Sequence, residues 1–212
     1  MPNWCRNVLV VSGAEKDVME FDRQFHGIPQ VYPGDKKPNK KQYTFSALRP
    51  IPLVVLQKGY WDPSEEGYRK WKEFCNKYDK ADIFYVASLP DEEFPNGYEW
   101  QCAKWGTKWD LVDDEDVNVK VEKDNTGNSR IIYTFDTAWS PVAPLVAYIE
   151  KKYQNLKFEL EFIEDCGGFF GYYKDGKYVE YTMEEVTQNP ELLKHFEHIQ
   201  NYLLELLEQA GE

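Results

Sequence analysis

Residues 105–110 read Trp-Gly-Thr-Lys-Trp-Asp, and this segment gathers the side chain types that most readily do chemistry. Tryptophan faces stack on flat or cationic groups, while a lysine and a carboxylate at the rim could orient a ligand. The segment favours a structural turn, with both rings in the core, Gly106 in a left-handed conformation and Thr107 or Asp110 as a cap. The alternative is a binding role for Trp105, Lys108, Trp109 and Asp110.

Four more residues complete the candidate ligand or partner site. Trp4 and Trp139 stand just outside an expected strand or helix end, where binding groups often lie. Asn7 stands directly before the first expected strand, where its simplest role is to satisfy backbone groups. Glu164 ends the last expected core strand. We expect a genuine site if Trp4 and Trp139 lie near Trp105 or Trp109.

Catalysis and metal binding have weaker signals. Cys5 and Cys166 lack a neighbouring histidine in sequence, although the fold could supply one. His195 and His198 share an expected helix at i, i+3 spacing and could ligate one metal, but no companion motif accompanies them. The acidic run 110–116 lacks the glycine and glutamate of an EF-hand. We expect no catalytic residue, no metal site and no cofactor; a hydrolase or transferase using Asp110, Glu164 or Cys166 is the least favoured hypothesis.

Composition narrows the classes of protein further. The 212 residues include 37 acidic and 25 basic side chains, giving a formal net charge of −12, and 16% are aromatic. Such a charge repels phosphate backbones, so we expect no non-specific nucleic-acid binding. The four cysteines form no CxxC pair, and neither a signal-peptide pattern nor a membrane-spanning run occurs. These features predict a cytoplasmic protein with reduced thiols and no membrane contact.

The hydrophobic periodicity predicts an α+β fold with a mostly antiparallel sheet and helices on one face, of the ferredoxin-like type. Residues 1–182 form this domain, with an insertion at about 53–104 whose part 79–97 is open between helix and strand. Ser64 reads as a helix start and Ser140 as a helix cap. The expected elements are strands 8–11, 43–48 and 158–164, helices 14–26, 98–104 and 141–153, and hairpins 117–135 and 169–181.

Residues 183–212 carry the signature of one long helix. Their apolar residues repeat at 4-3-4-3 spacing, as in a short heptad seam: Leu192, Phe196, Ile199, Leu203 and Leu206. We expect this helix to dock on the domain. A homodimer or a partner helix at this seam is the alternative.

Four segments together resemble the YubB-like family, proteins with a ferredoxin-like domain found mainly in phages, prophages and plasmids. They are Pro2 to Val8 with its Asn-Trp-Cys, the hexapeptide at 105–110, Phe135 to Pro141 with its Thr-Ala-Trp-Ser-Pro, and Phe158 to Gly171. The resemblance implies the fold and a mobile-element origin. It supplies no activity, and the cysteines lack the spacing of an iron–sulfur site.

Two functions follow as expectations. The first is a non-enzymatic protein that engages a host protein through acidic loops and exposed aromatic rings. The acidic run, with Asp91 to Glu93, could then imitate a phosphate array. The alternative is a module that binds a small, nucleotide-like ligand in a Trp-lined pocket containing Lys108, Trp109 and Trp139.

Overall fold

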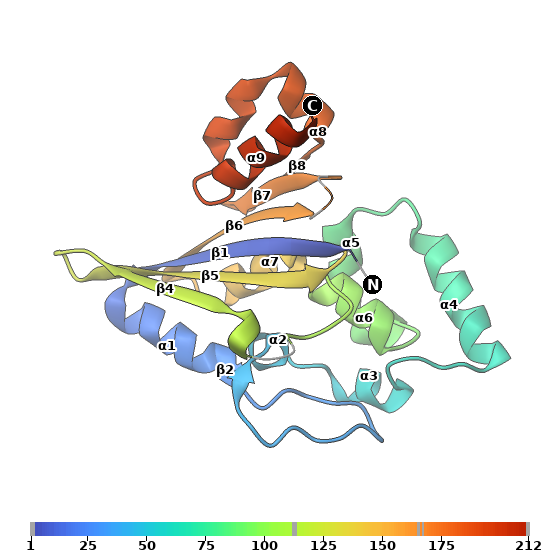
Figure 1. Cartoon of the computed structure of the whole chain (residues 1–212). Helices are drawn as coiled ribbons and strands as arrows, with labels where there is room; N and C mark the ends of the chain where they lie inside the picture. Colours follow the sequence, from blue (N-terminus) through green and yellow to red (C-terminus); the bar gives the residue numbers. More distant parts are fainter. Residues whose placement is uncertain (1–2, 112–113, 165, 167, 211–212) are drawn as a thin grey trace.

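The computed structural model describes residues 3–111, 114–164, 166 and 168–210. Its main sheet has six strands, and every neighbouring pair is antiparallel. In chain order they are β1 (Trp4–Ala14), β4 (Asn118–Lys123), β5 (Asn128–Ala138), β6 (Leu156–Glu164), β7 (Phe170–Lys174) and β8 (Lys177–Tyr181). Their spatial order is β4-β5-β1-β6-β7-β8 (Figure 1).

The ferredoxin-like fold is confirmed by this order. The chain runs β1, then helix α1 (Glu15–Phe25), then β4 and β5, then helix α7 (Ala143–Lys152), then β6. The four strands of this β-α-β-β-α-β unit lie in the order β4-β5-β1-β6. The hairpin of β7 and β8 extends the sheet beyond β6, and the positive φ of Asp175 and Gly176 closes it.

A long excursion separates α1 from β4. It contains a two-stranded sheet of β2 (His26–Gly27) and β3 (Gln42–Tyr43). Its helices are α2 (Phe45–Leu48), α3 (Leu53–Lys58), α4 (Glu65–Tyr78), α5 (Ile83–Ser88) and α6 (Gly97–Lys104), with single turns η1 (Asp91–Glu93) and η2 (Asp114–Asp116). Residues 79–97, for which the sequence does not decide between helix and strand, are therefore mostly helical.

The strand expected over 43–48 is wrong. Only Gln42 and Tyr43 pair as a strand, Thr44 is the extended N-cap residue, and the chain then turns into α2. Thr44 caps that helix through the N–H of Ser46. The Asp110 carboxylate, far away in sequence, accepts the N–H of Phe45 at 2.6 Å. An acceptor from another segment thus overrides the local strand preference.

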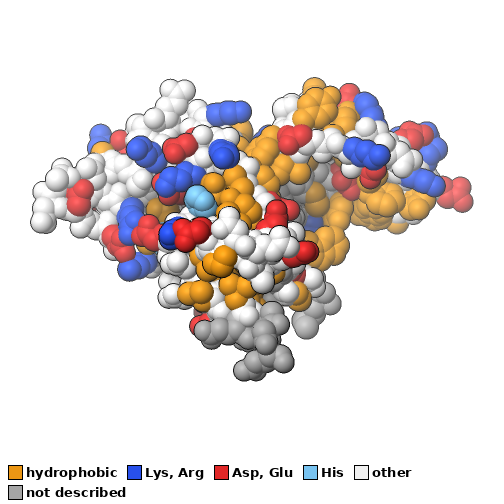
Figure 2. All heavy atoms as spheres, turned by 90° about the horizontal axis from the view of Figure 1, so that it is seen from above, with side chains coloured by type: hydrophobic (Ala, Val, Ile, Leu, Met, Phe, Trp, Pro, Cys, Tyr) orange, Lys and Arg blue, Asp and Glu red, His pale blue; other side chains and the backbone are white. Residues whose placement is uncertain are grey.

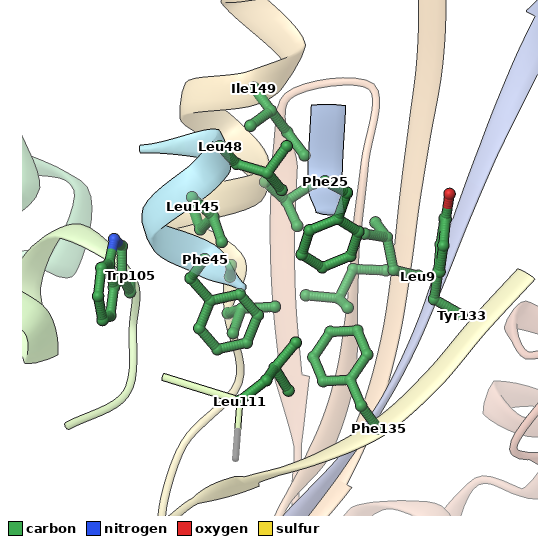
Figure 3. Packing of buried hydrophobic residues seen from close by; sticks show 14 of the residues in the cluster. Leu9, Phe25, Phe45, Leu48, Trp105, Leu111, Tyr133, Phe135, Leu145 and Ile149 are labelled. Atoms are coloured by element: carbon green, nitrogen blue, oxygen red, sulfur yellow. The ribbon is translucent and has the colours of Figure 1, made fainter. Parts of the chain in front are cut away.

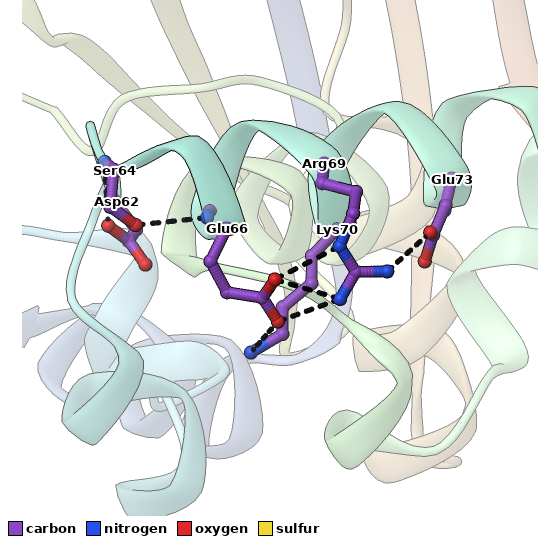
Figure 4. Close-up of polar contacts among 7 residues, drawn as sticks. Asp62, Ser64, Glu66, Arg69, Lys70 and Glu73 are labelled. Carbon is purple, nitrogen blue, oxygen red and sulfur yellow. Dashed lines mark hydrogen bonds and ion pairs between the residues drawn. The ribbon is translucent and has the colours of Figure 1, made fainter.

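Helix α4 forms as its sequence predicts. The Ser64 side chain accepts the Gly67 N–H at 3.0 Å, which satisfies one of the first free backbone donors. Figure 4 shows the exposed face of α4, where Glu66, Arg69, Lys70 and Glu73 form a chain of ion pairs. Exposed pairs of this kind contribute little to stability, because water and salt screen the charges. The opposite face therefore holds the helix in place.

The main core lies between the sheet and the layer of α1, α2 and α7. Leu9, Tyr133 and Phe135 project from the sheet toward Phe25 of α1 and Phe45 of α2 (Figure 3). The rings of Phe25 and Tyr133 meet edge to face, with centroids 5.4 Å apart. This core makes the end of the sheet beside residues 105–110 a rigid support. No helix in the described part of the chain is long and apolar enough to cross a membrane.

The C-terminal segment covers the opposite face of the sheet. It consists of α8 (Met183–Gln188), η3 (Pro190–His195) and α9 (Gln200–Ala210), and the single long helix expected here is wrong. Pro190 starts a new turn, and residues 196–199 are not helical. The seam residues Phe196, Ile199 and Leu203 are nevertheless buried, since they pack on the second face of β1, β5, β6 and β7.

Glu161 fastens this segment to the sheet. Its carboxylate accepts the backbone N–H groups of Glu197, His198 and Ile199 at 2.8, 2.9 and 3.0 Å. These donors lie just before α9, where the helix dipole also favours a negative charge. The alternation of Phe158, Leu160 and Phe162 with glutamates predicts that Glu159, Glu161 and Glu164 face water. This is wrong for Glu161 and Glu164, which are buried.

Replacing Glu161 by Gln should loosen that segment selectively. The amide would keep one acceptor and lose the charge, and charge-assisted hydrogen bonds contribute about 1.5–3 kcal/mol each. Hydrogen exchange should accelerate over residues 183–210 and stay unchanged in β1 and β5. Glu159→Gln, which removes only the ion pair with Lys174, is the matched control. Equal exchange in the two variants would contradict this role.

Candidate functional site

Three of the segments that carry the family resemblance meet at one end of the sheet. Trp4 pairs with Ala138 across β1 and β5, and the Trp139 N–H donates to the Asn3 carbonyl at 2.9 Å. The Thr107 hydroxyl donates to the Ala138 carbonyl at 3.1 Å. Glu164, from the fourth segment, pairs with residue 5 on the other side of β1. The fold thus gathers motifs that are far apart in sequence.

Gly106 makes the close approach between residues 105–110 and 139–141 possible. Its φ of +93° is a left-handed conformation, and a Cβ there would lie 2.2 Å from the Pro141 carbonyl oxygen. The Ser140 hydroxyl donates to the Gly106 carbonyl at 2.7 Å. Ser140 was expected to cap the following helix, and this is wrong, because its side chain bonds to this loop and α7 begins at Ala143.

Lys108 lies between two tryptophan rings. Its Nζ is 3.6 Å from the ring centroid of Trp139 and 4.2 Å from that of Trp109. Such cation–π contacts contribute about 0.5–2 kcal/mol each. The ring of Trp4 lies 6.3 Å from that of Trp109, tilted by 52°. The three rings remain exposed, at 36%, 40% and 49% for Trp4, Trp109 and Trp139.

Trp139 is held in a strained backbone conformation. Its φ is +74°, in a region that bulky residues rarely adopt, at a cost of about 1–3 kcal/mol. The neighbouring hydrogen bond from the Thr137 hydroxyl to the Ser140 carbonyl, at 2.7 Å, fixes the turn. The result is a large apolar ring held at the surface instead of in the core.

A pocket of about 450 Å³ opens beside Trp4 and Trp109. Its charged lining residues, within the described chain, are three aspartates: Asp110, Asp116 and Asp136. Asp116 and Asp136 are exposed, and Asp136 forms an ion pair with Arg6 at 3.4 Å. Aromatic faces next to carboxylates form an environment for a cationic group.

Asp110 supports the pocket wall. Its carboxylate accepts the Thr44 hydroxyl at 2.5 Å and the N–H groups of Phe45, Ser46 and Leu111 at 2.6, 3.3 and 2.8 Å. Burial raises the pKa of Asp110, and these four donors oppose that rise. With its acceptor sites filled, the carboxylate positions the 105–110 segment against α2.

The remaining predicted site residues, Trp105, Asn7 and Glu164, are buried. Trp105 is fully buried, and its indole N–H donates to the Arg49 carbonyl at 3.0 Å. Asn7 is also fully buried. Glu164 is buried, and its Oε2 accepts the N–H groups of Cys166 and Gly168 at 3.1 and 3.0 Å. These three residues therefore support the end of the sheet, while Trp4, Lys108, Trp109 and Trp139 form its surface.

Sequence reasoning missed Asp136 as a pocket residue. Asp136 stands at an outward-facing position of β5, opposite Arg6. Its presence in the segment Phe135 to Pro141 is the sequence signal that could have identified it. Asp116 was noted only as part of an acidic run. Asp113 of that run lies outside the described residues. His195 and His198 do not share a helix, because the first ends η3 and the second lies before α9.

The four cysteines differ in their surroundings. Cys5 is fully buried and Cys166 is exposed. Burial, and then the nearby Glu99 carboxylate, raise the pKa of Cys102 to about 12. Since the thiolate is the reactive form, Cys102 should be a poor nucleophile.

Alkylation of Cys102 by iodoacetamide should therefore be slow in the folded protein. At about pH 8, a thiol of pKa about 12 is ionised in only about one molecule in ten thousand. We expect Cys102 to react readily only after unfolding in urea, as read by peptide mass spectrometry. Modification of Cys102 in the folded protein as fast as in urea would contradict the raised pKa of that thiol.

Comparison with known proteins agrees with the architecture. Residues 104–201 match the family model described as the ferredoxin-like domain in Api92-like protein. The fold is ferredoxin-like. A crystal structure of a protein api92 from Yersinia pseudotuberculosis is 12% identical, with a TM-score of 0.42 over 86% of this chain and 98% of that chain. No curated protein matches the chain. The family match includes Lys108, Trp109 and Trp139 but begins after Trp4.

Proposed function

We propose that this chain is a protein-binding module, without a reaction of its own, that takes a basic side chain of its partner into the Trp4–Trp109 pocket. The observation that carries the proposal is the composition of that pocket. Two half-exposed indole rings stand beside the exposed carboxylates of Asp116 and Asp136. A guanidinium or ammonium group gains both cation–π and ionic contacts in such a place.

The charge of the whole chain supports the same partner chemistry. At a formal charge of −12, the field around the protein attracts basic surfaces and accelerates their encounter. Rigid aromatic rings add binding area with little loss of rotamer freedom, and tryptophan is frequent among the residues that dominate interfaces. The strained backbone of Trp139 and the position of Lys108 between the Trp109 and Trp139 rings keep these three side chains at the surface of the protein.

The resemblance to YubB-like proteins of phages, prophages and plasmids makes a bacterial host protein the proposed partner. A second copy of this chain is disfavoured, because the seam residues Phe196, Ile199 and Leu203 already pack on the chain's own sheet. A catalytic role for Asp110 is also disfavoured, since the Thr44 hydroxyl and three backbone N–H groups engage its carboxylate. Glu164 is buried, and backbone donors engage its Oε2, while its Oε1 has no hydrogen-bond partner among the described residues.

A tagged pull-down from a bacterial host lysate, quantified by mass spectrometry, tests the proposal. We expect a host protein that the wild type enriches and that Asp116→Lys/Asp136→Lys loses. Asp35→Lys/Glu184→Lys makes the same change in net charge at exposed positions elsewhere and should retain the partner. Added salt should weaken capture, since ionic attraction is screened. Equal capture by both double variants, or equal loss, would overturn the role of the pocket.

A further inference from the structure

A second cavity, of about 440 Å³, lies between the helical excursion and the end of the sheet. Helices α4, α5 and α6 supply one side, and residues 139–144, Phe169 and β8 supply the other. Seen from above, hydrophobic and acidic side chains border the hollow between the body of the sheet and the lobe that carries α4 (Figure 2). This size suits a small molecule.

The walls of this cavity are mostly apolar. Aromatic rings come from three separate parts of the chain, and smaller apolar side chains fill the spaces between them. The apolar lining includes Phe74, Tyr78, Ala81, Trp139, Phe169 and Tyr178. A flat aromatic body would bury most of its surface there.

The charged groups in the lining are two carboxylates, Glu99 and Glu180, and the described lining contains no Lys, Arg or His. Tyr178 donates its hydroxyl to Glu180 Oε2 at 2.6 Å, and Trp71 donates its indole N–H to Glu99 Oε1 at 2.6 Å. Among the described residues, no hydrogen bond is made to Glu99 Oε2. Burial raises the pKa of Glu99, and a bound cation would oppose that rise.

We propose that this cavity is a binding site for a small aromatic amine. The ring lies against Trp139, Phe169 and Tyr178, and the ammonium group donates to Glu99. The two carboxylates in the lining outnumber the adjacent ammonium group of Lys108, whose Nζ lies 3.6 Å from the Trp139 ring centroid, and they select a positive ligand over a negative one. This site is separate from the Trp4–Trp109 pocket, and it stands whether or not that pocket binds a protein.

Calorimetric titration with two probes of one shape tests this proposal. The probes are 2-naphthylmethylammonium and 2-naphthylacetate, which share a ring system and differ in charge. The wild type should bind the cation at least about ten-fold more tightly than the anion. Glu99→Gln should reduce that preference to about two-fold or less, because the amide keeps an acceptor for Trp71 but loses the charge.

Two further variants define the site. Ala81→Phe places a ring in the cavity and should abolish binding of the cation, whereas Glu184→Gln on α8 should change nothing. Melting curves of all variants verify that they fold. Failure of the wild type to bind either probe, or equal binding of both, would overturn the proposal. Cation binding that survives Ala81→Phe in a folded variant would place the probe elsewhere and overturn it as well.

Discussion

Replacing Trp109 by alanine should weaken binding of the captured partner by at least about ten-fold, the size of loss found when a central aromatic residue of an interface is truncated. Trp109 contributes one wall of the pocket and holds Trp4 and Lys108 in place. Its loss therefore removes contact area and the cation-binding face together. Surface plasmon resonance with the partner identified by pull-down measures this change directly.

Trp61→Ala is the matched control for that measurement. Trp61 is 41% exposed, as Trp109 is at 40%, but it packs against Trp71 and Tyr98, away from the pocket. We expect its replacement to change affinity by less than about two-fold. Lys108→Ala should have an intermediate effect, because the ammonium group acts by positioning the rings of Trp109 and Trp139. A loss of affinity as large in Trp61→Ala as in Trp109→Ala would contradict the proposed site.

The second large effect concerns stability and belongs to Asn7. Its amide donates to the Cys5 carbonyl and to the Thr137 hydroxyl, both at 2.8 Å, and accepts the Val142 N–H at 3.2 Å. Replacement by alanine removes these three hydrogen bonds and leaves the buried Val142 N–H without its Asn7 acceptor. A lost hydrogen bond costs about 1 kcal/mol and an unsatisfied buried group about 1–3 kcal/mol, so we expect Asn7→Ala to lower the free energy of unfolding by about 3 kcal/mol. Urea denaturation measures the change.

Asn118→Ala provides the comparison for Asn7. Asn118 is exposed at the start of β4, and surface substitutions of this kind change stability by about 0.5 kcal/mol or less. Because the Asn7 side chain joins β1, β5 and the start of α7, its loss should also reduce binding at the tryptophan pocket. A difference between the two variants of less than about 1 kcal/mol would show that the Asn7 network contributes little to stability.

Local signals in the sequence were sufficient where an element depends on its own residues. Alternating valines and the turn expected at 124–128 predict the hairpin of β4 and β5, and Ser64 predicts the start of α4. The expectations failed where a side chain distant in sequence determines the local backbone conformation. Asp110 turns residues 45–48 into a helix, and Glu161 holds the break before α9. Neither acceptor could be assigned to its donors from spacing alone.

The candidate site was also predictable only in part, because local sequence signals do not show which side chains the fold exposes. The motifs at 4, 105–110 and 139 pointed to a cluster, and the fold brings four of these side chains together. Sequence could not separate Trp105 from Trp109, although they stand in one hexapeptide. Gly106 turns the chain between them, so that one ring enters the core and the other lies at the surface. Exposure is set by that turn and by the packing of α6.

Site-specific photo-crosslinking at position 109 tests the central claim most directly. A photoreactive benzophenone amino acid replaces Trp109 in one protein and Trp61 in a second, and each is irradiated in host lysate. We predict a crosslink from position 109, absent from position 61, to one host protein at a segment containing Arg or Lys. Crosslinks of equal yield from both positions, or a crosslink from position 109 to a segment without a basic residue, would contradict the claim.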